Sequence, residues 1–202
     1  MHCDAKIMQL SSIADAKAGY PFRGAVTDVR DGPVRVLQIR DVSSEGVADW
    51  SGVLRTALGG RREPEWVIKG DLVFVVRGTH YFAAVIDNIP GPTVFGPHLF
   101  HLRLKKKVRV LPRFLAWQLN QPPIQRCLHQ AAEGSNQLSI RRAELESLPI
   151  GIPSMTDQQR IVDLAELAAR ERMLLGQLIR NREQELGRLA FALAGPTGAG
   201  NN

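Results

Sequence analysis

The sequence predicts an α+β protein in which one mixed α/β domain is followed by a long C-terminal helix of the coiled-coil type. Short apolar runs bounded by glycine and proline, which are typical of β-strands, occur through residues 34–104. Short helical patterns follow, and apolar residues then recur at helical spacing through 154–194 without a proline. We therefore expect a domain over residues 1–153, a helix over 154–194 and a flexible tail over 195–202.

The first third of the chain predicts one strand between two irregular segments. Residues 6–24 are expected to form a polar lead-in. Residues 34–42, VRVLQIRDV, are rich in β-branched side chains and predict a mostly buried strand. Residues 43–65 are polar and contain glycine, so they predict a loop with a short helix.

The clearest strand is residues 72–76, a continuous apolar run that follows a tight turn at Lys69-Gly70-Asp71. Residues 83–89 predict the strand that returns beside it. Residues 90–97, PGPTVFGP, contain so many prolines and glycines that we expect a loop there.

Residues 99–105 alternate between apolar and polar side chains, which predicts a half-buried strand. The apolar set, which is expected to face the core, is Phe100, Leu102 and Leu104. The polar set, which is expected to make a cationic outer face, is His101, Arg103 and Lys105, with Lys106 and Lys107 beyond it.

Three short helices are expected between this strand and the long helix. Residues 113–120 form the first, and residues 124–132 form the second, with Pro123 at its first position. Ser139 is expected to cap a third, which runs through Leu145.

The long helix is expected to begin at a capping box, with Thr156 as N-cap and Gln159 three residues later. Its apolar stripe has polar interruptions near Glu171–Arg172 and Arg182–Glu185, and such positions can set register and partner choice. A helix this long exceeds what a small domain needs, so we expect it to pair with another helix. The alternative is a helix that packs on its own domain. The residues expected to make the helix pair are Ile161, Leu164, Leu167, Ala168, Leu175, Leu178, Leu186 and Leu189.

The positive charge of the chain is concentrated in one region. The formal net charge is +6, and residues 154–202 carry six basic and six acidic residues, so the excess lies in 1–153. Residues 97–142 carry nine lysines and arginines against the single acid Glu133. This concentration favours a polyanion partner, most often nucleic acid, and the alternative is a solvated basic face with no specific partner.

No pattern in the sequence indicates catalysis, a metal site or a cofactor, so we expect none. His98 and His101 would point to opposite faces of a strand, and no glycine-rich phosphate loop or nuclease carboxylate motif is present. The N-terminus has no apolar signal segment, and no apolar run approaches the length of a membrane span. Cys3 and Cys127 are isolated, as reduced thiols usually are, so we expect a cytoplasmic protein that does not bind membranes.

Five short motifs follow one another along most of the chain. They are Lys-Gly-Asp-Leu-x-Phe-x-x-Arg-Gly at 69–78, Phe-Leu-x-x-x-Leu-Asn at 114–120, Gly-Ser-x-Gln-x-Ser-Ile at 134–140, Leu-Pro-Ile-x-Ile-Pro at 148–153, and a Gln followed by Ile-Val at 159–162. Each motif is weak alone. Together, in this order, they resemble the DNA-specificity subunit of type I restriction–modification systems.

The resemblance implies a target-recognition domain over 1–153 and a spacer helix over 154–194. Members of that family usually carry two such units in one chain, with the two helices packed antiparallel, whereas this chain has one. It therefore resembles a half-subunit, which we expect to form a homodimer through its helix or to pair with another half.

The resemblance also implies a function without catalysis. Specificity subunits bind adenine DNA methyltransferase subunits and direct them to a bipartite site in double-stranded DNA, and a restriction subunit can join the complex. Two other functions stay open. One is a stand-alone DNA-binding repressor or architectural protein, and the other is an enzyme, against which the absence of carboxylate clusters counts.

Within such a DNA-binding domain, lysines would contact phosphates and loop side chains would read bases. The phosphate candidates are Lys105, Lys106 and Lys107. The candidates for base reading are Arg77, Thr79, His80, Ser135, Asn136, Gln137, Arg141 and Arg142. For Ser135 and Asn136 the alternative is ordinary turn chemistry.

Overall fold

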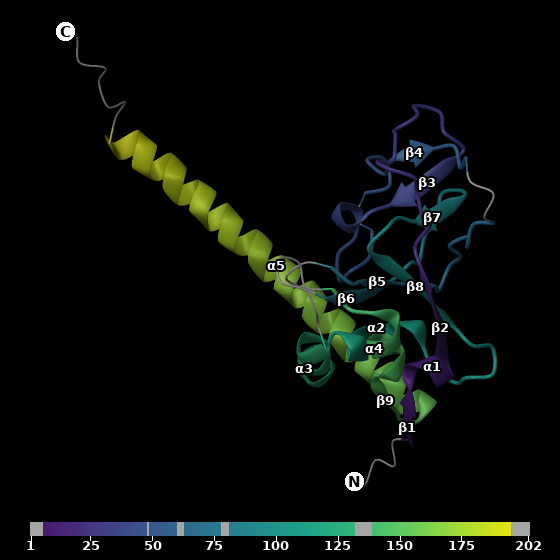
Figure 1. Ribbon diagram of the computed structural model, residues 1–202. Helices are drawn as coiled ribbons and strands as arrows, with labels where there is room; N and C mark the ends of the chain where they lie inside the picture. The colour runs from purple at the N-terminus through teal and green to yellow at the C-terminus, as the bar shows by residue number, and fades with distance from the viewer. Residues whose placement is uncertain (1–5, 48, 60–62, 78–80, 132–138, 195–202) are drawn as a thin grey trace. The chain divides into compact units, whose positions relative to one another are not determined.

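The computed structural model describes residues 6–47, 49–59, 63–77, 81–131 and 139–194, and the chain divides into two units, Met1–Arg160 and Ile161–Asn202. The α+β fold class is confirmed, with short strands and helices in the first unit and one long helix leading into the second (Figure 1). The elements in chain order are β1 (Lys6–Gln9), α1 (Leu10–Ile13), β2 (Ala14–Ala18), β3 (Val34–Leu37), the 3₁₀ turn η1 (Ile39–Asp41), β4 (Arg55–Thr56), β5 (Leu72–Val75), β6 (Phe82–Val85), β7 (Thr93–Phe95), β8 (Leu99–Leu104), α2 (Pro112–Leu119), α3 (Pro122–Ala131), α4 (Arg142–Ser147), β9 (Pro149–Ile152) and α5 (Met155–Ala194).

The first unit is built around an antiparallel sheet of four strands in the order β2-β8-β5-β6, which we call the central sheet. β8 lies between β2 and β5, and its Leu102 is paired with Ala16 on one side and Leu72 on the other. The turn before β5 forms as the sequence predicts, with Gly70 at a φ of +90°, a conformation that glycine adopts without strain. The predicted returning strand is β6, which pairs along β5.

A small sheet of three strands, in the order β4-β3-β7, packs against one face of the central sheet. Buried side chains from both sheets form their shared core: Leu37, Phe95, Val73, Val75, Ala84 and Leu99. The prediction of a loop at residues 90–97 is wrong, because Thr93–Phe95 pair in parallel with β3 and are buried. The prolines and glycines flank this strand and do not interrupt it.

Three neighbouring predictions also need correction. β3 ends at Leu37, earlier than expected, because η1 follows it. Residues 43–65 contain strand β4, and no helix occurs among the residues of this span that the structure describes. Residues 6–24 are not a simple lead-in, since they contain β1, α1 and β2.

Helix α2 packs against β6, and its Phe114, Leu115 and Leu119 are buried as the sequence predicts (Figure 1). The residue after the helix, Asn120, binds the outer edge of β6. Its Oδ1 accepts a hydrogen bond from the Ala83 N–H at 2.7 Å, and its Nδ2 donates to the Ala83 carbonyl at 2.8 Å. The second helix, α3, begins at Pro122, one residue before Pro123, which was the expected first position.

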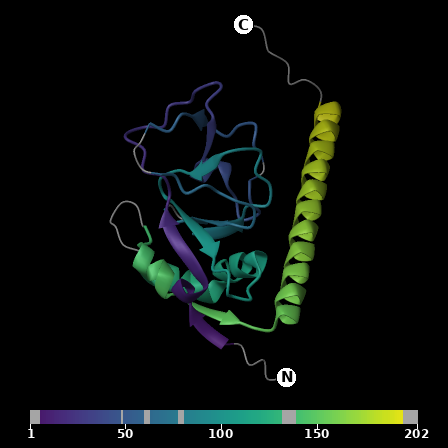
Figure 2. The same ribbon diagram turned by 90° about the vertical axis from the view of Figure 1, so that its right-hand side faces the viewer.

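The start of the long helix is fixed by Ser154 and Gln158, and not by the predicted pair Thr156 and Gln159. Ser154 Oγ accepts a hydrogen bond from the Asp157 N–H at 3.2 Å and donates to the Asp157 carboxylate at 2.7 Å, so Ser154 is the capping residue in place of Thr156. α5 follows β9 along the chain (Figure 2) and begins at Met155, the residue after this cap. This is two residues earlier than a cap at Thr156 would place it. The fully buried Gln158 accepts from the Leu111 N–H at 2.9 Å and donates to the Arg109 carbonyl at 3.1 Å. Its side chain therefore ties the first turn of α5 to the loop before α2.

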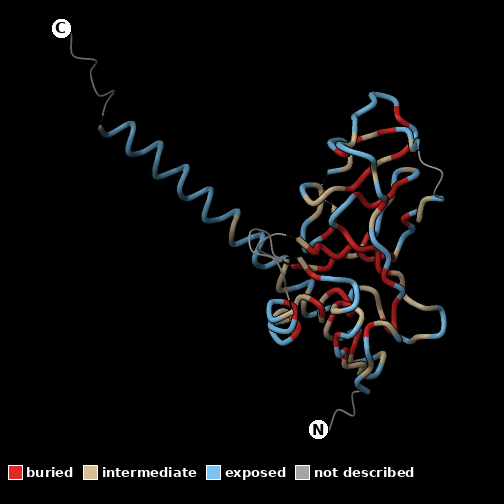
Figure 3. The backbone as a smooth tube through the Cα atoms, in the orientation of Figure 1, coloured by how far each residue is buried: buried red, intermediate tan, exposed pale blue. Residues whose placement is uncertain are grey.

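α5 contains 40 residues, and at 1.5 Å per residue it is about 60 Å long. Figure 3 shows that most residues of α5 beyond Arg160 are exposed. They include most of its large apolar residues. Of the residues expected to form a helix pair, Ile161 and Ala168 are half-buried. The exposed ones are Leu164, Leu167, Leu175, Leu178, Leu186 and Leu189. Within the described ranges, no helix is both long enough and apolar enough to cross a membrane.

Candidate nucleic-acid interface

Arg77 lies just beyond β5, at one end of the central sheet. It forms an isolated antiparallel bridge with Ser139, and the Ile140 N–H donates to the Val76 carbonyl at 3.1 Å. Ser139 was expected to cap α4, but this pairing uses it as an extension of the sheet. The structure thus brings together two segments that are far apart in the sequence and that both border predicted base-reading residues.

The Arg77 guanidinium is held by a histidine. Its Nη1 lies 3.2 Å from His98 Nδ1 and 3.1 Å from His98 Nε2. Burial and the charge of Arg77 both lower the pKa of His98, which favours the neutral ring that can accept a hydrogen bond. His98 stands before β8 at a φ of 70°, so the predicted placement of His98 on a strand is wrong.

Arg141 and Arg142 lie at the start of α4, and both are exposed. Arg141 Nη2 donates to Glu144 Oε1 at 2.6 Å, and Arg142 Nε donates to Glu146 Oε1 at 2.7 Å. The hydrogen bond from Arg141 lowers the pKa of Glu144. To read a base, each arginine would have to exchange a surface ion pair, which contributes little to stability, for the contact with DNA.

The lysine triplet forms the turn that follows β8. Lys106 and Lys107 are exposed, and neither forms a hydrogen bond or ion pair with another residue that the structure describes. Lys105 differs, because its Nζ donates to the Ser11 carbonyl at 2.6 Å and lies 3.6 Å from Asp15 Oδ1. The exposed cations of this turn are therefore Lys106 and Lys107.

The two sets of candidates lie at opposite ends of the central sheet. β5 and β8 are antiparallel, with Val75 beside Leu99 and Leu72 beside Leu102. Arg77 therefore lies at the Leu99 end, whereas the lysines follow Leu104. At 3.4 Å per residue the strand between them spans about 17 Å. The structure does not gather all the candidates in one place.

The other predicted site residues, Thr79, His80, Ser135, Asn136 and Gln137, lie outside the described residues.

The prediction of a cationic outer face on β8 is wrong for His101 and Arg103. Both side chains bind the buried carboxylate of Asp71, which stands just before β5. His101 Nε2 lies 2.7 Å from Asp71 Oδ2, and the Phe95 ring of the small sheet packs edge-on to the imidazole. Arg103 donates to both oxygens of Asp71 at 2.8 Å. The face that was expected to meet solvent therefore meets the small sheet.

Asp71 is charged although it is only 2% exposed. Burial opposes its ionised form, but hydrogen bonds from Arg103, from His101 and from the Ile68 N–H outweigh burial and lower the pKa of Asp71. Asp71 lies inside a sequence motif, but its partners lie in β8, so no local pattern revealed the pairing.

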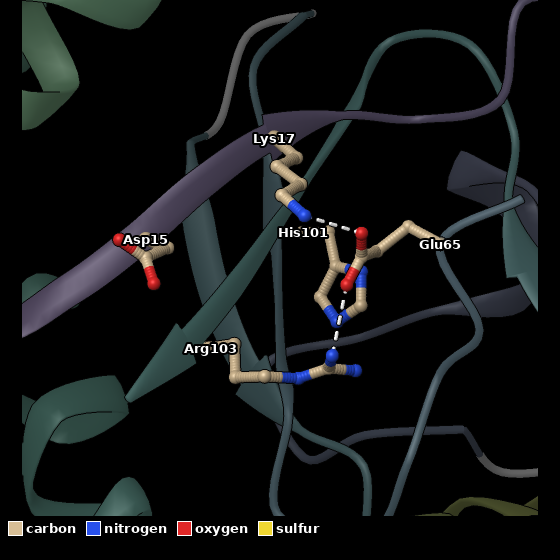
Figure 4. Close-up of a pocket in the computed structure, with 5 residues that line it drawn as sticks. All are labelled: Asp15, Lys17, Glu65, His101 and Arg103. Atoms are coloured by element: carbon tan, nitrogen blue, oxygen red, sulfur yellow. Dashed lines mark hydrogen bonds and ion pairs between the residues drawn. The ribbon is translucent and has the colours of Figure 1, made fainter. Parts of the chain in front are cut away.

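Beside this buried group lies a hollow of about 140 Å³, which Figure 4 shows. It is lined by Asp15, Lys17, Glu65, His101 and Arg103. Lys17 forms an ion pair with Glu65, which lowers the pKa of Glu65, and Arg103 Nη1 donates to the same carboxylate at 2.8 Å. Lys17, Glu65 and Arg103 thus satisfy one another's charges, whereas Asp15 lies 3.6 Å from Lys105, which does not line the hollow. Lys17, Glu65 and Arg103 stabilise the contact between β2, β8 and the segment before β5.

Among the residues that the structure describes, no group of three or more His, Cys, Asp or Glu residues could hold a metal ion. Cys127 is free and exposed on α3.

Comparison with known proteins gives a result at the level of fold. No family model matches the sequence, and no curated protein matches it either. Solved structures are similar across nearly the whole chain, among them the following three. A type I restriction–modification S subunit from M. genitalium has a TM-score of 0.58 at 17% identity and covers 95% of this chain. The HsdS subunit from Thermoanaerobacter tengcongensis has a TM-score of 0.63 at 18% identity and covers 94%.

The third structure belongs to a study of complex assembly and conformational transition of the type I R-M system. It has a TM-score of 0.68 at 18% identity and covers 93% of this chain. The chain spans only 46% of the M. genitalium chain, 44% of the chain from the R-M study and 43% of the T. tengcongensis chain. The resemblance inferred from the sequence motifs is therefore confirmed as a similarity of fold, and this chain matches about half of a type I restriction–modification S subunit.

Proposed function

We propose that this chain is a DNA-specificity subunit that carries one target-recognition domain and directs an adenine DNA methyltransferase to a bipartite site. The observation that carries the proposal is the match of 95% of this chain to 46% of an S subunit. The exposed lysines after β8 supply a phosphate contact, and Arg77, Arg141 and Arg142 supply side chains able to read guanine. The subunit itself needs no catalytic group for this role.

Methylation mapping tests this function. The chain is co-expressed with an adenine methyltransferase from the same genome, and N6-methyladenine is mapped on the host DNA. We expect methylation at one interrupted sequence, and we expect it to disappear when the chain is omitted. Methylation that does not depend on the chain would reject the proposal. Binding to a two-fold DNA site by the chain alone, with no methyltransferase association, would favour a repressor or architectural role.

Two copies are needed if each carries one recognition domain for a two-part site. The exposed leucines of α5 offer the contact, because an apolar stripe of this extent is unusual on a monomer. We expect light scattering to give a dimer at tens of micromolar. Leu175→Asp with Leu178→Asp should make the chain monomeric and leave the first unit folded.

The control for that variant is Gln177→Asp with Gln184→Asp, which adds the same charges at exposed positions outside the apolar stripe. It should stay dimeric. A wild-type chain that is monomeric would point to a different half-subunit as partner.

Base reading is tested at Arg142. Arg142→Ala should cost about 1–3 kcal/mol on the site found by methylation mapping and less on random DNA. Arg126→Ala, an exposed arginine on α3, serves as control. Equal losses on both DNAs would make Arg142 a backbone contact.

A further inference from the structure

Charged residues interrupt the apolar face of α5 at two places. Eight positions follow one another in alternating steps of four and three residues, a spacing that keeps their side chains on one face of a paired helix. They are Leu164, Ala168, Glu171, Leu175, Leu178, Arg182, Glu185 and Leu189, and we call them the heptad face. The helix is continuous through all of them, so the charges of Glu171 and Arg182 flank the central leucines on the same face.

The heptad face is exposed except at Ala168, which is half-buried. Leu164, Leu175, Leu178 and Leu189 have exposed fractions of 68%, 52%, 54% and 53%. Glu171 and Arg182 are exposed as well. Arg182 Nη1 donates to Glu185 Oε2 at 2.9 Å, which uses one of the five N–H donors of the guanidinium. The remaining donors can bind a second carboxylate.

The order of these charges distinguishes a parallel helix pair from an antiparallel one. In a parallel pair in register, each residue meets its own copy, so Glu171 would face Glu171 and Arg182 would face Arg182. In an antiparallel pair about a two-fold axis, each residue meets the one equally far on the other side of the axis. With the axis between Gly176 and Gln177, Glu171 of one copy meets Arg182 of the other.

The same register accommodates the other positions. Leu175 meets Leu178 and Leu164 meets Leu189, so leucines pack on leucines. Ala168 meets Glu185, where the small side chain leaves room for the carboxylate. A shift of one heptad would instead place Arg182 opposite Leu164 or Leu178 and Glu171 opposite Leu175 or Leu189. Both charges would then lose their partner and meet a leucine.

We propose that α5 pairs antiparallel with α5 of a second copy, about a two-fold axis between Gly176 and Gln177, with two reciprocal Glu171–Arg182 ion pairs that fix the register. The occupant is a second copy because the heptad face complements its own reversed sequence in charge and in shape. Polar pairs inside a helix interface select one register at some cost in stability. This inference rests on the proposed self-association and on the antiparallel packing that the resemblance implies, and it adds the register and the ion pairs that fix it.

Disulfide cross-linking of the full chain tests the register, with Cys3→Ser and Cys127→Ser as background. A Glu171→Cys chain co-expressed with an Arg182→Cys chain should form a disulfide-linked dimer, and each chain alone should form little. Met173→Cys co-expressed with Arg180→Cys is the control, since these residues are equally far from the axis but lie on the outward face. Cross-linking of each chain with itself would show a parallel pair. A mixture of Glu171→Cys and Arg182→Cys chains that does not cross-link would overturn the register.

Charge exchange gives a second readout. Glu171→Arg and Arg182→Glu should each weaken the dimer by roughly tenfold or more, because each creates two like-charge contacts. The double variant restores opposite charges and should return to within about threefold of the wild-type dissociation constant. Arg180→Glu, the same charge change on the outward face, should have little effect. A double variant as weak as the single ones would overturn the ion pairs.

The mass of the wild-type chain separates the two proposals. A monomer would reject the proposed self-association together with this inference. A dimer that fails the cross-linking and charge-exchange tests would reject the register alone.

Discussion

The middle of β8 and the turn that follows it belong to one basic stretch of sequence, but only the cation within β8 is bound by acidic side chains. Arg103 binds Asp71 and Glu65, and the two acids come from segments more than thirty residues away. Lys106 and Lys107 meet no such acid among the described residues. A cation is therefore available to DNA only where the fold brings no carboxylate to it, and a count of charges along the chain does not reveal this.

The largest effect is expected from removing the carboxylate of Asp71, which binds Arg103. Asp71→Ala should lower the free energy of unfolding by about 3–5 kcal/mol, because it leaves Arg103 and His101 without their buried acceptor. Urea denaturation measures the loss. The control is Asp87→Ala, which removes an exposed carboxylate from Arg113 and should cost about 1 kcal/mol or less. Equal losses would show that the buried group is no more important than a surface pair.

The contribution of Asp71 to the free energy of unfolding should also depend on pH. The pKa of Asp71 is lower in the folded chain than in the unfolded one, so its contribution is complete above the unfolded value, about 3.9, and is lost as pH falls through the folded value. The unfolding free energy of the wild type should therefore fall more steeply in acid than that of Asp71→Asn. Parallel curves for the two proteins would contradict the lowered pKa.

The exposed lysines of the turn after β8 are tested through the salt dependence of DNA binding. Lys106→Ala with Lys107→Ala should reduce the slope of log K against log salt for duplex DNA by about 1.8, since each phosphate contact contributes about 0.9. Adding Lys105→Ala should change the slope little further, because Lys105 already binds Ser11 and Asp15. An unchanged slope in the double variant would place the phosphate contacts elsewhere. A large further change from Lys105 would make it a DNA contact too.

Patterns that act over a few residues were sufficient for much of the fold. The apolar run of β5, the turn at Gly70 and the proline-free stripe of α5 each specify their element locally, and each is present. Strand β7 was missed because its three residues are held by parallel pairing with β3, which lies far away in the sequence. Ser154 and Thr156 are both residue types that cap helices, and it is Ser154 whose hydroxyl exchanges hydrogen bonds with Asp157.

The candidate interface was less predictable for the same reason. The sequence indicated that Arg103 and Lys106 were alike, and it could not show that Asp71 reaches one of them. It also favoured Gln159, whereas the neighbouring Gln158 is the buried side chain that binds two backbone groups of the loop before α2. The two glutamines are consecutive in the sequence, and only the tertiary contacts of the folded chain show which of them is buried.

Strand β6 lies at the edge of the central sheet, and such an edge offers unpaired N–H and carbonyl groups on which another polypeptide can add as a further strand. Asn120 occupies both groups of Ala83 with one side-chain amide, as a neighbouring strand would. The amide cannot itself be extended, so at this position it ends the sheet. The last residue of the Phe-Leu-x-x-x-Leu-Asn motif thus occupies two of the backbone groups on which another strand could add at this edge.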